Sequence, residues 1–197
     1  MDISDIRRLD LLWVKIYPYL AAQVVFFLPK SPRKLLELGP FSGGISLELS
    51  KSVKDCSIVI ADTEHEILDY LSHRVKERNL SGRIRLEWTP LFPLKFEDRE
   101  FDGVISRGAF FFLNEPILRE IHRVLKRGGI GFVGGGFGVS TPRNLIDEVA
   151  PESRRLNRRL GKKWLCKAAL EKMITAADLE HSVQIIEEGG LWLLLKK

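Results

Sequence analysis

The clearest chemical signal in the sequence is an acidic residue, a glycine-rich turn and a second acidic residue in close succession. Glu37 lies in the apolar run Lys34–Leu38, residues 39–44 read Gly-Pro-Phe-Ser-Gly-Gly, and Asp62 ends the next apolar run. Glycine permits close approach of the backbone to a ligand. The helix that follows such a turn offers free N–H groups and a positive dipole end to an anion. Because a carboxylate can also accept hydrogen bonds from a ribose diol, the spacing predicts a site for a nucleoside cofactor.

The elements that must position these residues alternate between strand and helix. Periodicity predicts strands over residues 33–38, 57–61, 83–88, 101–106 and 130–133, and helices over 44–50, 64–78 and 115–126. This alternation predicts a parallel α/β sheet with helices on both faces. The Arg-Gly-Gly sequence at residues 127–129 predicts a glycine C-cap for the last of these helices.

The two ends of the chain differ from this core. Residues 182–187 and 191–195, joined by Gly189 and Gly190, predict an antiparallel hairpin at the sheet edge. At 197 residues we expect one domain. Its predicted parts are an N-terminal helical cap, a cofactor-binding core, and C-terminal helices with the hairpin, over residues 1–30, 31–136 and 137–197 respectively.

The N-terminal segment is the one place where a membrane span has to be considered. Leu11–Leu28 is largely apolar, but a lysine, a proline and a glutamine interrupt it, so we expect a pair of buried or capping helices that Pro18 separates. The two cysteines, Cys56 and Cys166, share no motif spacing. They predict neither a disulfide framework nor a metal site, and a reducing, cytoplasmic environment is the expectation.

The positive charge of the chain is local. The formal net charge is +5, and residues 154–163 alone contribute six basic side chains and no acidic one. Without them the chain would be slightly acidic. If this segment is helical, the basic residues share one face, which predicts a solvated surface. The alternative is a contact with an acidic substrate, a nucleic acid or an anionic membrane surface.

Four stretches together resemble the class I S-adenosylmethionine-dependent methyltransferases, especially the small-molecule type that includes quinone-biosynthesis C-methyltransferases. They are the glycine turn at residues 36–43, the second strand end at 59–62, the strand at 100–106, and the helix and glycine turn at 118–129. The resemblance implies a Rossmann-like fold with a mostly parallel seven-stranded sheet and a C-terminal antiparallel hairpin. It also implies S-adenosylmethionine as the cofactor.

Carried over position by position, the resemblance implies distinct roles around the cofactor. Asp62 would bind the ribose hydroxyls, and Thr63 and Leu91 would surround the adenine. Ser106 and Arg107 would lie beneath the methionine end. The complete cofactor-binding set implied is Glu37, Gly39, Pro40, Phe41, Gly43, Asp62, Thr63, Leu91, Ser106 and Arg107.

Two positions depart from the family pattern. Phe41 occupies the place of the usual middle glycine, and Pro90 occupies the place where an acid often contacts the adenine amino group. The adenine is therefore expected to be recognised through a backbone N–H near Leu91.

The acceptor side of the site carries aromatic residues. Residues 110–112 are three consecutive phenylalanines after the fourth strand, and they either line the acceptor pocket or belong to the core. Trp13, Tyr17 and Tyr19 form a lid or simply pack on the sheet. The glycine-rich residues 134–138 form either a plain connector or a loop that lets a ligand approach closely.

These observations predict methyl transfer to a small, partly apolar acceptor, without stable membrane insertion. The sequence offers no convincing general base and no cluster with metal-ligand spacing. One alternative is an RNA or protein methyltransferase that uses the basic segment, and another is a non-catalytic S-adenosylmethionine-binding protein. A nicotinamide-dependent oxidoreductase is disfavoured because Phe41 replaces the second glycine of the dinucleotide fingerprint.

Overall fold

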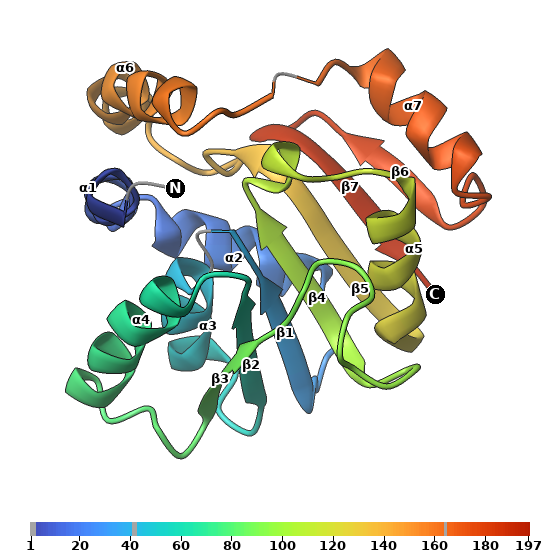
Figure 1. Cartoon of the computed structure of the whole chain (residues 1–197), viewed down its shortest axis with the longest axis horizontal. Coiled ribbons are helices and arrows are strands. Elements are labelled where there is room, and N and C mark those ends of the chain that lie inside the picture. The colour runs from blue at the N-terminus through green and yellow to red at the C-terminus, as the bar shows by residue number, and fades with distance from the viewer. Residues whose placement is uncertain (1–2, 41–42, 164) are drawn as a thin grey trace.

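A seven-stranded sheet forms the centre of the molecule (Figure 1). The computed structural model describes residues 3–40, 43–163 and 165–197, so the prediction for Phe41 lies outside the described residues. The strand order is β3-β2-β1-β4-β5-β7-β6. The strands are β1 (Lys34–Leu38), β2 (Ser57–Asp62), β3 (Ile84–Trp88), β4 (Phe101–Arg107), β5 (Leu125–Gly136), β6 (Val183–Ile186) and β7 (Gly190–Lys196).

Strand pairing confirms the predicted topology. Leu36 of β1 pairs in parallel with Val59 of β2 and Val104 of β4. β7 runs antiparallel to both β5 and β6, so the C-terminal hairpin forms one border of the sheet. The carboxyl ends of the parallel strands β1, β2, β4 and β5 therefore meet at one border, which we call the carboxyl edge. In open α/β sheets this is where ligands bind.

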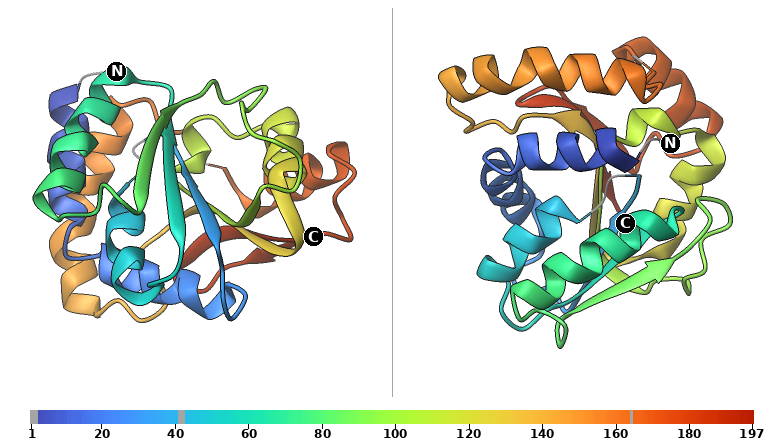
Figure 2. Two further views of the ribbon diagram at one scale, coloured as in Figure 1. Left: turned by 90° about the horizontal axis from the view of Figure 1, so that it is seen from below. Right: turned by 60° about the vertical axis from the view of Figure 1, so that its left-hand side comes forward.

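Helices cover both faces of the sheet (Figure 2). The hydrophobic core has two parts, one on each face of the sheet, and successive strand residues point to opposite parts. Leu35 and Ile105 pack towards α1–α4 and α6, whereas Leu36 and Val104 pack towards α5 and α7. The helices are α1 (Ile3–Trp13), α2 (Tyr17–Phe27), α3 (Gly44–Ser52), α4 (His65–Glu77), α5 (Glu115–Val124), α6 (Arg143–Arg159) and α7 (Lys167–Ala176), with a short 3₁₀ turn η1 (Ala109–Phe111).

The N-terminal segment forms the expected helix pair. α1 ends at Trp13, α2 begins at Tyr17, and Pro18 occupies the first turn of α2, where its missing N–H costs no helical bond. Within the described residues, no single helix is long and apolar enough to cross a membrane. α1 and α2 meet that criterion only as a pair, across a bend of 75°.

The helix predicted over residues 115–126 ends earlier than expected. α5 stops at Val124, and Leu125 already has extended backbone, with φ −71° and ψ 137°. Leu125 pairs with Phe101 of the neighbouring strand β4, so β5 begins at this point instead of a further helical turn. The predicted glycine C-cap at residues 127–129 is therefore wrong, and those residues lie within β5.

The basic segment is not one continuous helix, contrary to the assumption behind a single basic face. α6 ends at Arg159, and Gly161 follows with a left-handed φ of 82°. The N–H of Gly161 donates to the carbonyl of Arg158 at 3.1 Å, and the N–H of Lys162 donates to that of Asn157 at 2.9 Å. This pair of bonds is a Schellman cap, which turns the chain away from the helix axis.

Candidate functional site

Glu37 fixes the glycine-rich turn at the end of β1. Its buried carboxylate accepts the backbone N–H of Ser46 at 2.6 Å and also that of Gly43. Gly43 has a φ of 108°, which favours glycine, and it caps α3. Burial raises the pKa of Glu37, while these hydrogen bonds and the nearby Arg107 act in the opposite direction. Glu37 therefore ties the first turn of α3 to β1.

Asp62 lies against the same turn. It is fully buried at the end of β2, and its Oδ1 accepts the N–H of Glu64 at 3.1 Å. A Cβ on Gly39 would lie only 2.2 Å from Asp62 Oδ2, so a larger residue at position 39 would displace the carboxylate. The strand-end acid and the glycine turn are thus in direct contact, and the buried Pro40 follows Gly39 in the turn.

One buried polar atom at the carboxyl edge points to a polar ligand. The Ser46 side chain, in the first turn of α3, faces the carboxylate of Glu37, whereas Nε of Arg107, at the end of β4, has no hydrogen-bond partner among the described residues. Buried polar atoms nearly always have partners in folded proteins. The glycine-rich turn, the two buried carboxylates and this guanidinium fit the nucleoside and amino-acid parts of S-adenosylmethionine.

Thr63 and Leu91 lie further along the edge, next to Trp88. Both are partly buried. The carbonyl of Thr63 accepts the indole N–H of Trp88 at 2.9 Å, and His65 stacks on Trp88 at 5.8 Å between ring centroids. Lys95 Nζ lies 4.0 Å from the centroid of the same indole. Trp88 was not among the predicted site residues, although its position at a strand end beside Thr63 is a usable signal.

Ser106 and Arg107 occupy the end of β4, in the middle of the sheet. The hydroxyl of Ser106 donates to the carbonyl of Leu38 at 3.0 Å, so Ser106 links β4 to β1. Arg107 is only 6% exposed. Its guanidinium lies 4.4 Å from the centroid of the Trp13 ring and 5.5 Å from that of Tyr17. The aromatic residues of the N-terminal helices therefore enclose the Arg107 side chain.

The N-terminal helices are bound to the glycine turn. The Tyr17 ring is so close to Gly44 that a Cβ there would lie 2.1 Å from Tyr17 Cζ. The Tyr17 hydroxyl donates to Asp10 of α1 at 2.8 Å, and Asp10 also accepts from Tyr70 and Arg74 of α4. Trp13 and Tyr17 therefore pack in the core as one of the two alternatives expected, and their role as a lid stays a prediction.

A small cavity, which we call the aromatic pocket, adjoins Arg107. Its volume is about 250 Å³. Gly135 and Gly136 of β5 contribute to its wall, so the glycine run is not a plain connector but strand backbone that pairs with β7 and borders the cavity. Of the three consecutive phenylalanines, Phe110 lines it. The pocket is also lined by Trp13, Phe137, Arg154, Lys162 and Leu165.

Lys162 is the site residue that sequence reasoning missed. It was assigned to a solvated basic face, yet it lies inside the aromatic pocket, with Nζ 3.7 Å from the position that a Cβ on Gly135 would take. Burial and the nearby positive charge of Arg107 lower its pKa to about 8. The available signal was Gly161, because a glycine after a helical pattern predicts a cap that reverses the chain.

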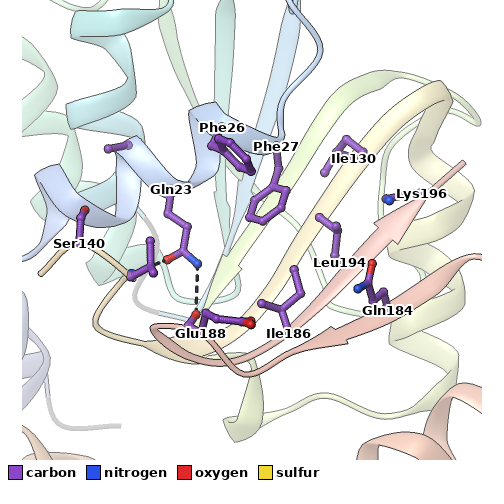
Figure 3. Close-up of a pocket in the computed structure, with 12 residues that line it drawn as sticks. Gln23, Phe26, Phe27, Ile130, Ser140, Gln184, Ile186, Glu188, Leu194 and Lys196 are labelled. Atoms are coloured by element: carbon purple, nitrogen blue, oxygen red, sulfur yellow. Dashed lines mark hydrogen bonds between the residues drawn. The ribbon is translucent and has the colours of Figure 1, made fainter.

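A second, larger groove lies elsewhere on the molecule (Figure 3). Its volume is about 650 Å³, and it lies between α2 and the β7–β6 hairpin. Phe26 and Phe27 face Ile186 and Leu194 across it, and Gln23 donates to the carbonyl of Glu188 at 3.3 Å. Among the predicted cofactor-binding residues that the structure describes, none lines this groove.

Comparisons with known proteins match the central part of the chain. A family model described as a methyltransferase domain matches residues 35–129. A ubiquinone/menaquinone biosynthesis C-methyltransferase of Geobacter sp. (strain M21) is 33% identical over 99 residues, which are 49% of this chain and 42% of that protein. A demethylmenaquinone methyltransferase of Thermus thermophilus is 34% identical over 106 residues, 52% of this chain and 46% of that protein. The chain spans about half the length of these curated relatives.

Solved structures match nearly the whole chain. A structure from Methanococcus maripaludis described as an S-adenosyl-L-methionine-dependent methyltransferase has a TM-score of 0.82 and 27% identity, covering 98% of this chain and 91% of that one. A SAM-dependent methyltransferase from Aquifex aeolicus shares the fold, with a TM-score of 0.69 and 18% identity. The match covers 99% of this chain and 97% of that one. With the strand order, these matches identify residues 35–129 as a methyltransferase domain within the Rossmann-like fold of the class I S-adenosylmethionine-dependent methyltransferases.

Proposed function

We propose that this protein transfers the methyl group of S-adenosylmethionine to a small, partly apolar acceptor bound in the aromatic pocket. The main observation behind the proposal is that Trp13 of the pocket wall lies over Arg107 at the carboxyl edge, and that Arg107 also neighbours Tyr17, which packs on Gly44. Bound S-adenosylmethionine supplies an electrophilic methyl group on a sulfonium ion. The C-methyltransferase names of the curated relatives support a small-molecule acceptor.

The residues of the carboxyl edge bind and orient the cofactor in this proposal. Asp62 accepts hydrogen bonds from the ribose hydroxyls, and the backbone of Gly39, Pro40, Gly43 and Gly44 lies along the methionine part. Thr63 and Leu91 border the adenine. Glu37 holds the turn in place through Ser46. None of these roles requires a proton transfer, because alignment of the two reacting atoms dominates such a reaction.

The aromatic pocket and the N-terminal helices position the acceptor and exclude water. Trp13 and Phe110 contribute ring faces from opposite parts of the chain, which suits a flat or apolar molecule. The volume of about 250 Å³ lies slightly below the usual range for drug-sized ligands, so the pocket suits a small acceptor rather than a polymer. Tyr17 and Trp13 cover Arg107 and restrict solvent at the methionine end.

The test is formation of S-adenosylhomocysteine with a panel of acceptors. We expect turnover with small phenols, quinols or aromatic acids, and none with RNA or with a denatured protein mixture. Phe110→Ala, which opens the pocket, should raise KM for the acceptor at least several-fold. The control Phe92→Ala removes a 59% exposed side chain outside the pocket and should have no such effect. Turnover with RNA alone would overturn the choice of acceptor.

A further inference from the structure

Trp88 holds the turn that follows Asp62. It is the last residue of β3, and in the parallel pairing of β2 and β3 it lies opposite Asp62. Its indole N–H donates to the carbonyl of Thr63 at 2.9 Å. The backbone N–H of the next residue, Thr89, donates to the carbonyl of Asp62 at 3.2 Å. Two consecutive carbonyls of the turn are therefore bound to two consecutive residues at the end of β3.

The same turn sets the direction of the Asp62 carboxylate. Oδ1 of Asp62 accepts the N–H of Glu64 at 3.1 Å, which is the pattern of an Asx turn. Oδ2 lies on the side of Gly39, 2.2 Å from the position that a Cβ on this glycine would take. Because the carboxylate and the turn are bonded to each other, a displacement of the turn would also move the carboxylate.

The Trp88 ring is itself held by two other segments. His65, the first residue of α4, stacks on it with 5.8 Å between ring centroids and an interplanar angle of 7°. Lys95 places Nζ 4.0 Å from the centroid of the indole, which is within the range of a cation–π contact. An indole has a single N–H to donate, and Trp88 uses it on Thr63. The ring is therefore a fixed support of the turn.

The nucleoside end of the site depends on this turn because of Pro90. A proline side chain cannot accept the hydrogen bond that an acid at this position would accept from the adenine amino group, and it leaves no N–H for a ring nitrogen. In the proposed function, the adenosine group is therefore held by Asp62, Thr63 and Leu91. The first two of these residues belong to the turn that Trp88 holds.

We propose that Trp88 is a positioning residue for the adenosine half of S-adenosylmethionine. Through Thr63 it sets the turn for the adenine and the Asp62 carboxylate for the ribose hydroxyls, and it touches neither reacting atom. The inference rests on the proposed function and deepens it, because it assigns nucleoside binding to a residue outside the predicted cofactor-binding set. A change at Trp88 should weaken every ligand that carries the adenosine group by the same factor.

The first experiment measures the Kd of S-adenosylhomocysteine and of 5′-methylthioadenosine, which lacks the amino-acid part, by calorimetry on the full chain. Trp88→Phe keeps an aromatic ring and removes the N–H. We expect it to weaken both ligands by the same factor of about five- to tenfold, as for one lost hydrogen bond. Arg85→Met is the matched control, because Arg85 is an exposed residue of the same strand that pairs with Glu87 and does not contact the turn. It should bind both ligands as the wild type does.

The second experiment follows the indole ¹H–¹⁵N resonance of Trp88, assigned by triple-resonance NMR of the wild-type protein. We expect 5′-methylthioadenosine to shift this resonance, because the ligand contacts the turn to which the N–H is bonded. L-Methionine at the same concentration should leave it in place. A residue that only stabilised the fold would give no such ligand-specific shift, and this measurement does not require the variant to fold.

Three results would overturn the inference while S-adenosylhomocysteine still binds the wild-type protein. They are an unchanged Kd in Trp88→Phe, a loss for S-adenosylhomocysteine but not for 5′-methylthioadenosine, and an indole resonance that 5′-methylthioadenosine does not move. Failure of the proposed function has a different signature, because the wild-type protein then binds neither ligand. The two failures are therefore distinguishable without a turnover assay.

Discussion

Lys162 is the residue whose positive charge should lower the stability of the fold at neutral pH. Burial and the nearby positive charge of Arg107 hold its folded-state pKa at about 8, below the ordinary lysine value of 10.5. The unfolded chain therefore holds this proton more tightly, so below pH 8 the charged lysine destabilises the fold. As pH rises from about 8 to 10.5, the folded protein becomes neutral at this position first, and the penalty disappears.

We therefore predict that Lys162→Met stabilises the protein at pH 7 by about 1–2 kcal/mol, after allowing for partial exposure. The gain should shrink through the interval from pH 8 to 10.5. Urea unfolding of both proteins at several pH values measures this difference. Lys163→Met should show no such pH-dependent gain. A destabilised Lys162→Met variant at pH 7 would show that Lys162 has a structural role.

At the scale of elements, the contact between α2 and α3 depends on the absence of a side chain at Gly44. Gly44→Ala would place a Cβ 2.1 Å from the Tyr17 ring. Overpacking of this kind costs about 1–3 kcal/mol, which exceeds the helix-propensity gain of about 1 kcal/mol. Thermal unfolding should show a lower Tm. The control Gly82→Ala has no atom within 4 Å of the new Cβ and should be nearly neutral.

Asp10 joins three helices and provides a second test at this scale. It accepts from Tyr17 of α2 and from Tyr70 and Arg74 of α4, and it is only 7% exposed. Asp10→Ala leaves the partly buried Arg74 without this partner and should cost about 3 kcal/mol in unfolding free energy. The exposed Asp55→Ala is the control. If Asp10→Ala has wild-type stability, the N-terminal helices are not held in place by this residue.

At the scale of the whole molecule, the basic segment is partly neutralised by acids from outside it. Arg155 pairs with Glu152 at 2.6 Å, and Arg159 pairs with Asp5 of α1 at 3.1 Å. A nucleic-acid-binding surface would instead need several uncompensated cations on one face. We predict that the double variant Arg158→Glu, Lys163→Glu keeps the turnover of a small acceptor. A large loss of rate, with steep salt dependence in the wild type, would favour RNA as the acceptor.

The sequence predicted the elements whose patterns are local. The Glu37 turn, the strand that ends at Asp62 and the C-terminal hairpin follow from periodicity and glycine position, and the structure has them where expected. The errors arise where tertiary contacts decide. α5 ends before Leu125 because Leu125 pairs with β4, and no local propensity indicates this pairing. Lys162 enters the aromatic pocket because of a cap at Gly161, whereas the charge pattern alone predicted a solvated face.

Calorimetric titration with S-adenosylmethionine tests the central claim most directly. We predict binding of one equivalent to the wild-type chain and no binding of NADH. Asp62→Ala should weaken the binding of S-adenosylmethionine by about 1.5–3 kcal/mol, because hydrogen bonds to a charged acceptor are lost. Glu66→Ala, an exposed acid in the first turn of α4, should bind as the wild type does. Absence of S-adenosylmethionine binding, or an unchanged affinity in Asp62→Ala, would contradict the account.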